Sequence, residues 1–227
     1  MDMNNIIKEF VVKKKIPIFG IAKANGFKYA LPEWHPKKLM PRSRSVLIFG
    51  MPFVKYKLSI DGKTYIANDF WWKINEPVQR SVEVWRGGFV NLLDDFGFSA
   101  ANFGGFGLSF KPTFSYRLAQ YEAGIGNYGR FGVCINPEYG CYYYVGVLIT
   151  DVKLKPSDKD RLNGYNPCKG CKLCAEVCPV KAIDAYKNPE EGYNRDRCVK
   201  FIMKIKQKYN DDVKVCARCF TVCPWAI

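Results

Sequence analysis

The sequence predicts an α+β protein in two parts, an α/β domain over residues 1–155 and a cysteine-rich segment over residues 156–227. Apolar runs of strand length alternate with helical periodicities along the first part. Eight of the ten cysteines then fall after residue 165. The composition, 48% hydrophobic and 25% charged residues, is typical of a folded chain.

The first part begins with a predicted amphipathic helix, because Ile6, Ile7 and Phe10 share one helical face. Residues 16–22 are an apolar run of strand length, and residues 45–50 are a second such run, closed by glycine. A proline-rich loop separates the two predicted strands. These elements are expected to form the start of a packed core.

Two helices are predicted in the middle of the chain. Residues 77–96 carry apolar side chains at helical spacing, with Pro77 in the first turn and Gly97 after the last. The Gly87-Gly88 pair inside this helix indicates a close approach by another part of the chain. A second helix is expected over residues 112–123.

A glycine-rich loop follows the second helix, with Gly124, Gly126, Gly129 and Gly132 within nine residues. Such a loop turns sharply or lets another group approach its backbone. A helix cap at Gly124 accounts for one or two of these glycines. The others suggest a flat ligand lying against the loop.

A buried strand over residues 141–149 comes next, and the polar stretch 151–167 marks the boundary of the first part. Cys134 and Cys141 lie beside this strand and are interpreted as buried, inert thiols. His35, the only histidine, is interpreted as a surface residue of the proline-rich loop. Nucleophilic catalysis that depends on a histidine is therefore not expected.

The cysteines of the last part form two runs. The first run is Cys168-x2-Cys171-x2-Cys174-x3-Cys178-Pro, the signature of bacterial two-cluster ferredoxins. In this signature the fourth cysteine ligates the other cluster, because it follows a helical turn and points away. The second run repeats the pattern without its first cysteine, and Cys198 stands ahead of it.

Applying this rule gives two complete sets of ligands in a ferredoxin-like segment with two [4Fe–4S] clusters. The first cluster is assigned Cys168, Cys171, Cys174 and Cys223, and the second cluster Cys178, Cys198, Cys216 and Cys219. A pair of zinc sites is the alternative, but zinc sites use two separated pairs of ligands. A disulfide framework is disfavoured further, because no export signal places the chain outside the cytoplasm.

The formal charge of +14 falls to about +10 when about −2 is counted for each cluster with its thiolates. Basic residues are spread along the chain, which leaves RNA binding and plain solvated helix faces both open. The longest apolar stretch, near residues 142–149, is far shorter than the roughly 20 residues of a membrane span. A cytoplasmic protein with no membrane partner is expected.

Several segments together resemble one family. Residues 116–119, the loop 124–132 and the following Ile135-Asn136-Pro137-Glu138-Tyr139-Gly140 resemble the glycine loop of epoxyqueuosine reductases and reductive dehalogenases. Residues 39–50 resemble the first core strand of that family, and the order of the cysteines, with the lone Cys198, is similar as well.

The resemblance implies a nitroreductase-like α/β domain and a cobalamin-dependent reductase, in which two clusters feed electrons to the corrinoid cobalt. By matching position, the loop would lie against the corrinoid. The candidate cofactor-binding residues are Gly124, Gly126, Tyr128, Gly129 and Arg130, with Arg130 expected to meet an anionic group.

One departure concerns the proton donor. Epoxyqueuosine reductases carry an acid shortly before the helix that leads to the loop, whereas residues 107–115 here contain none. Tyrosine is the remaining residue type suited to the role, and Tyr65, Tyr116 and Tyr128 are candidates. The alternative for each is a buried core tyrosine.

The expected function is that of an iron–sulfur oxidoreductase, with electrons entering at one cluster and leaving to a cofactor or substrate near the glycine loop. A ferredoxin- or flavodoxin-type donor and a small-molecule or tRNA substrate are the expected partners. The alternative is a non-enzymatic electron carrier whose first domain only docks other proteins. The size of that domain favours the enzyme, since carriers manage without one.

Overall fold

The computed structural model describes residues 2–53, 58–60, 63–65, 68–103, 114–189, 191–208 and 216–226. The chain forms two compact units, each built from several segments. The sheet unit comprises Met1–Pro52, Val78–Asn127 and Tyr143–Tyr165, and the cysteine unit comprises Phe53–Pro77, Tyr128–Tyr142 and Asn166–Ile227. The boundary of independent domains near residue 155 stays a prediction.

The sheet unit is built on four antiparallel strands in the order β1-β2-β8-β5. They are β1 (Ile18–Lys23), β2 (Ser45–Pro52), β5 (Ala100–Ala101) and β8 (Tyr143–Thr150). The three strands predicted from the sequence are present, with ends displaced by one or two residues. The short edge strand β5 was not predicted, because two alanines carry no periodic signal.

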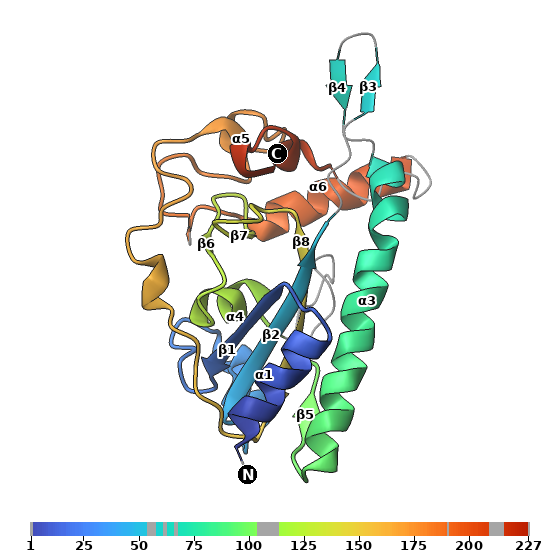
Figure 1. The fold of residues 1–227 in the computed structure, drawn as a ribbon. Coiled ribbons are helices and arrows are strands. Elements are labelled where there is room, and N and C mark those ends of the chain that lie inside the picture. The colour runs from blue at the N-terminus through green and yellow to red at the C-terminus, as the bar shows by residue number, and fades with distance from the viewer. Residues whose placement is uncertain are drawn as a thin grey trace. The chain divides into compact units, whose positions relative to one another are not determined.

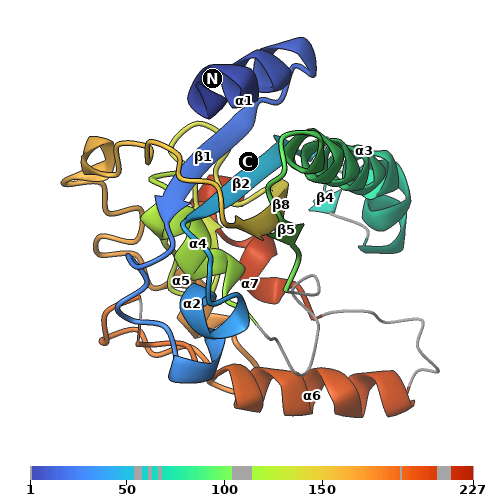
Figure 2. The same cartoon turned by 90° about the horizontal axis from the view of Figure 1, so that it is seen from below.

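Helices cover both faces of this sheet, as Figures 1 and 2 show. Helix α1 (Met3–Lys13) and the part of α3 (Asn68–Asp95) from Val78 onward lie on one face, and α4 (Tyr116–Glu122) lies on the other. Phe89 of α3 is fully buried, and its ring centroid lies 4.6 Å from Phe10 of α1 and 4.9 Å from Phe49 of β2.

Helix α3 begins nine residues before its predicted start, so that Pro77 lies inside the helix rather than in its first turn. Proline inside a helix costs about 3 kcal/mol or more, which is why it was interpreted as a start. Phe70, Trp71 and Ile74 continue the helical spacing ahead of the proline, a signal that the prediction did not weigh. Gly88 permits the expected close approach, since a Cβ there would lie 2.7 Å from the Phe10 ring.

The remaining helices and strands are short. Helix α4 begins later than predicted, at Tyr116, where the Ser115 hydroxyl accepts a hydrogen bond from the Leu118 amide. His35 caps a short helix, since its Nδ1 accepts a hydrogen bond of 3.1 Å from the Lys37 amide. The other short elements are α2 (Pro36–Leu39), η1 (Pro32–Trp34), η2 (Asp160–Leu162), and the pair β3 (Leu58–Ile60) and β4 (Lys63–Tyr65).

The cysteine unit has little regular structure apart from α6 (Arg195–Lys208). Its other helices are α5 (Leu173–Glu176), α7 (Arg218–Thr221) and η3 (Pro224–Ala226), and β7 (Cys134–Ile135) pairs with β6 (Asn127–Tyr128). Helix α5 packs against α7. Among the described residues no helix is long and apolar enough to cross a membrane.

Candidate metal centre

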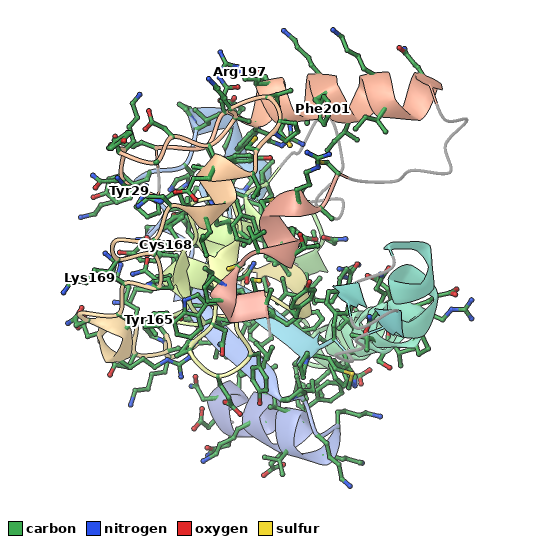
Figure 3. All side chains as sticks on the ribbon, turned by 90° about the horizontal axis from the view of Figure 1, so that it is seen from above. Tyr29, Tyr165, Cys168, Lys169, Arg197 and Phe201 are labelled. Carbon is green, nitrogen blue, oxygen red and sulfur yellow. The ribbon has the colours of Figure 1, made fainter. Side chains whose placement is uncertain are left out.

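The first cysteine run forms a tight loop that leads into α5. The Cys168 amide donates a hydrogen bond of 3.1 Å to Oδ1 of Asn166, and the Cys171 amide donates one of 3.2 Å to the Cys168 carbonyl. Gly170 has a φ of +72°, a conformation that favours glycine. Figure 3 labels Cys168 and Lys169 on this loop, and Arg197 and Phe201 on α6. This loop and the start of α5 therefore carry the thiols of Cys168, Cys171 and Cys174 within seven residues of the chain.

Four thiols gather around this loop. Burial, and then the neighbouring thiolates of Cys168, Cys171 and Cys223 in that order, raise the pKa of Cys174 to about 12. Burial also raises the pKa of Cys168, which the amide and the charge of Arg130 oppose. These four residues are the ones assigned to the first cluster from their spacing.

A second group of thiols surrounds Cys219. Burial raises the pKa of Cys219 to about 12, and the thiolates of Cys198, Cys174 and Cys216 contribute in that order. Burial and a hydrogen bond to Cys198 raise the pKa of Tyr193. Cys178, the fourth residue assigned to the second cluster, accepts a hydrogen bond of 3.2 Å from the Ala182 amide through its Sγ.

The chemistry of these thiols fits iron–sulfur clusters. Backbone N–H groups donate to Sγ of Cys168 at 3.4 Å and of Cys178 at 3.2 Å, as they do to charged thiolates. Buried thiols ionise with difficulty unless a metal takes their charge. Within the described residues, no three Cys, His, Asp or Glu side chains converge on a single-ion site.

Cys141 is buried, as its position beside a strand predicted, and it also contacts a proposed cluster ligand. It is 7% exposed and shares a hydrogen bond with Cys223, which raises the pKa of Cys141 and lowers the pKa of Cys223. Cys141 therefore stays a thiol and donates its S–H to the Cys223 sulfur. No sequence signal links the two residues, because 82 positions separate them in the chain.

Packing inside the protein explains most of the glycines in the loop. Gly124 has a φ of +65° after α4, and a Cβ there would lie 2.8 Å from Cα of Lys159. A Cβ on Gly129 would lie 2.8 Å from the Ile135 side chain, and one on Gly132 would overlap the Tyr193 ring. The predicted helix cap at Gly124 is thus present, and Gly129 and Gly132 allow other side chains to pack close to the loop backbone. Binding of a cofactor by this loop stays a prediction.

Arg130 lies against the cysteine loop and is 8% exposed. Its Nε donates a hydrogen bond of 3.2 Å to the Cys171 carbonyl, and its Nη1 donates to the carbonyls of Asp184 at 3.2 Å and Lys187 at 2.6 Å. The side chain was expected to meet an anionic group of a ligand bound at the loop. It is instead held among the carbonyls of the cysteine unit.

A small pocket of the sheet unit borders the glycine loop at Asn127. Its volume is about 180 Å³, and Tyr121, Lys159 and Leu162 are among its lining residues. Ligand pockets usually measure about 300–1,000 Å³, so this pocket alone does not fit a corrinoid. Lys159 beside it forms an ion pair of 3.1 Å with Glu122.

The three tyrosines considered as proton donors have different settings. The Tyr116 hydroxyl donates a hydrogen bond of 2.9 Å to Oδ1 of Asn102, and burial raises its pKa. Tyr128 is buried, with 8% exposure. The Tyr65 side chain and the acid-free residues 107–113 lie outside the described residues. None of the three is assigned to a proton transfer.

The sequence is similar to families of known chemistry. Residues 167–226 match the 4Fe-4S double cluster binding domain. An epoxyqueuosine reductase from Bacillus cereus is 32% identical over 120 residues, which cover 48% of this chain and 29% of that protein. A tetrachloroethene reductive dehalogenase from Desulfitobacterium hafniense is 31% identical over 116 residues, covering 46% of this chain and 21% of that protein. The chain thus spans less than a third of these relatives.

Solved structures of the same two groups share the fold. The structure of epoxyqueuosine reductase from Streptococcus thermophilus has a TM-score of 0.67 at 18% identity and covers 100% of this chain and 66% of that one. Epoxyqueuosine reductase with an epoxyqueuosine-modified tRNA stem loop has a TM-score of 0.66 at 19% identity, covering 98% and 65%. A reductive dehalogenase structure that suggests a mechanism for B12-dependent dehalogenation has a TM-score of 0.65 at 18% identity, covering 97% and 31%. The predicted α+β fold with a double-cluster segment at its end is confirmed.

Proposed function

We propose that this chain, a relative of the epoxyqueuosine reductases and reductive dehalogenases, is a cytoplasmic iron–sulfur reductase that passes single electrons through two [4Fe–4S] clusters. The observation that carries the proposal is the gathering of the cysteines within the double-cluster segment, in the two groups around Cys174 and Cys219. The proposed ligands are the two sets of four cysteines given by the spacing.

When bound, the clusters supply one-electron transfer without acid–base chemistry. The chain's own part is to hold the thiols and to exclude water from them. Cys168, Cys174 and Cys223 are each less than 9% exposed. Backbone amides donate to the sulfurs of Cys168 and Cys178 and stabilise negative charge on them. A ferredoxin- or flavodoxin-type protein is the proposed electron donor.

The electrons leave, in this proposal, to a cofactor or substrate held near the glycine loop. Cobalamin is the candidate because one relative's structure concerns B12-dependent dehalogenation, and tRNA is a candidate substrate because another contains a tRNA stem loop. The pocket beside Asn127 is too small for a corrinoid by itself, so no step is assigned to cobalamin. Gly124, Gly126, Tyr128 and Gly129 remain the proposed loop residues for a cofactor.

The first test concerns the metal and its ligands. Anaerobically reconstituted protein should contain about eight irons and eight acid-labile sulfides per chain. Cys178→Ala should remove the paramagnetic signal of the second cluster, and Cys223→Ala that of the first. Stoichiometric zinc without sulfide would refute the proposal. Loss of the same signal in Cys178→Ala and in Cys171→Ala would refute the crossed pairing of ligands.

The second test separates the enzyme from the electron carrier. Gly126 is buried in the loop, so Gly126→Val should abolish binding of added cobalamin while the iron content stays at its native value. Binding is measured by absorbance titration of the reconstituted protein, with Gly87→Val as the control, because Gly87 is exposed on α3 and has nothing within 4 Å of its Cβ position. Native protein that binds neither cobalamin nor a tRNA stem loop, yet exchanges electrons with a ferredoxin, would favour the carrier.

A further inference from the structure

Arg130 carries a buried charge that forms no ion pair with a carboxylate among the described residues. Three of its side-chain hydrogen bonds go to the neutral carbonyls of Cys171, Asp184 and Lys187. None of the ion pairs found among the described residues involves Arg130. A buried cation is stable only where an opposite charge compensates its lost hydration.

The thiolates of the first cluster can supply that charge. The Asp184 carboxylate also interacts electrostatically with Arg130, but it already accepts hydrogen bonds from the amides of Tyr186 and Lys187. The Arg130 amide donates to Sγ of Cys168 at 3.4 Å, and its Nε contacts the carbonyl of Cys171, the next ligand along the loop. The guanidinium charge favours ionisation of Cys168 and Cys174, although burial raises the pKa of both. The cation and the proposed ligands are thus electrostatic neighbours.

We propose that Arg130 is the internal counter-ion of the first cluster and raises the reduction potential of that cluster. The inference rests on the proposed function, because it requires the cluster to be present. One-electron reduction makes a cluster with four thiolates more negative, from about −2 to about −3, without taking up a proton. A buried cation stabilises the reduced form more than the oxidised form, and water screens it little.

Arg197 shows why burial matters. Its Nη1 also donates to a backbone carbonyl, that of Lys181, at 3.1 Å, and it lies on α6 one residue before Cys198. Its side chain is exposed, as Figure 3 illustrates, so water and salt screen its charge. Arg130 and Arg197 therefore both donate to backbone carbonyls beside proposed ligands, Arg130 through three hydrogen bonds and Arg197 through one, and they differ in solvent access.

The experiment is a redox titration of the anaerobically reconstituted full chain with dithionite, followed by paramagnetic resonance. The signal that Cys174→Ala removes identifies the first cluster. Arg130→Gln should shift the midpoint potential of this signal to a more negative value, because glutamine keeps a donor and loses the charge. Arg130→Lys, which keeps the charge, should stay near the native potential, and Arg197→Gln should shift neither cluster.

Assembly of the cluster gives a second readout. If Arg130→Gln fails to retain the first cluster while Arg130→Lys retains it at the native potential, the counter-ion role is supported. Native potentials in both variants would overturn it. Equal loss of the cluster in both variants would also overturn it, since the guanidinium would then act only as a clamp on three carbonyls. Native protein without iron and sulfide would refute the proposed function instead, so the two failures are distinguishable.

Discussion

Gly140 has a φ of +64°, and a Cβ placed there would overlap the backbone carbonyl of Trp225. The same carbonyl accepts a hydrogen bond of 3.1 Å from the Cys141 amide. The Trp225 indole in turn donates a hydrogen bond of 2.8 Å from Nε1 to the Pro167 carbonyl. Trp225, the second residue after the last proposed ligand, thus joins the turn before β8 to Pro167, the residue before the first proposed ligand.

Gly140→Ala should therefore destabilise the cysteine unit. An alanine at positive φ costs about 1–2 kcal/mol, and the overlap with a backbone that cannot shift adds about 1–3 kcal/mol. Gly97→Ala is the control, because Gly97 has a φ of +75° with nothing within 4 Å of its Cβ position. Anaerobic urea unfolding, with iron retention measured in parallel, should show the larger loss for Gly140→Ala. Equal losses would contradict the contact.

Cys141→Ala should shift the potential of the first cluster to a more negative value, because it removes the S–H donor to the Cys223 sulfur. Cys141→Ser keeps a donor and should shift it less. Cys134→Ala, a second buried thiol of the same stretch, should leave the potential unchanged. A shift of the same size in Cys134→Ala would show that only general packing had been disturbed.

The sequence predicts the cysteine ligands far better than the residues around them. Spacing along the chain specifies Cys168, Cys171 and Cys174, because a cubane needs thiolates at intervals that one short loop sets. Arg130 acts on Cys168 from 38 positions away and Cys141 acts on Cys223 from 82 positions away, and only the fold brings each pair close. The sequence shows that Arg130 is charged, but it does not show where the side chain points. Backbone carbonyls hold the side chain in place, and every residue type has such a carbonyl.

At the scale of elements, a buried strand is easier to predict than the end of a helix. Strand β2 contains Val46, Leu47, Ile48 and Phe49, all fully buried, so its apolar run is continuous. The start of α3 was misplaced because local proline chemistry was weighed above the apolar spacing around it. The pairing order β1-β2-β8-β5 joins strands far apart in sequence, and local patterns carry no information about it.

The contact between Tyr144 of β8 and Glu83 of α3 predicts how the stability of the protein depends on pH. Burial, and then the charge of Glu83, raise the pKa of Tyr144 to about 12, and the Tyr144 hydroxyl lies 3.3 Å from Oε1 of Glu83. The unfolded tyrosine ionises near pH 10, so this contribution to stability is complete below pH 10 and is lost as pH rises toward 12. The full difference is about 2–3 kcal/mol.

Urea unfolding at pH 9 and pH 11 should show that stability falls less steeply in Tyr144→Phe than in the native protein. A titration of phenolate absorbance should lose one late-ionising tyrosine in the same variant. If the native and variant proteins lose stability in parallel, Tyr144 ionises normally in the folded state and the expected dependence is wrong.

At the scale of the whole molecule, the two units differ in what holds them together. The sheet unit has a continuous core, with Val46, Phe89 and Leu148 fully buried. Beside α6, the cysteine unit contains α5 and α7, of four residues each, which are far too short to be stable alone. In the proposed function, iron–thiolate bonds supply most of the folding free energy that this unit needs.

Anaerobic removal of iron with a chelator should therefore unfold the cysteine unit selectively. Hydrogen exchange followed by mass spectrometry should show fast exchange in α5 and α7, while β2 and β8 keep their protection. Refilling with iron and sulfide should restore slow exchange. Simultaneous loss of protection in β2 and β8 would show that the chain unfolds as one cooperative body.

The contact between Trp225 and the turn at Gly140 also determines the order in which parts of the chain can fold during synthesis. Strands β1 and β2 can emerge from the ribosome and begin to fold while later residues are still being added, as is usual for N-terminal elements. The loop from Tyr128 to Tyr142 belongs to the other unit, and the contacts of its last residues, Gly140 and Cys141, must wait for residues 223–225. In the proposed function, the ligand set of the first cluster is complete only after Cys223 has been added, and a nascent chain stalled before Cys223 would present three thiols and an unfinished site to the assembly machinery.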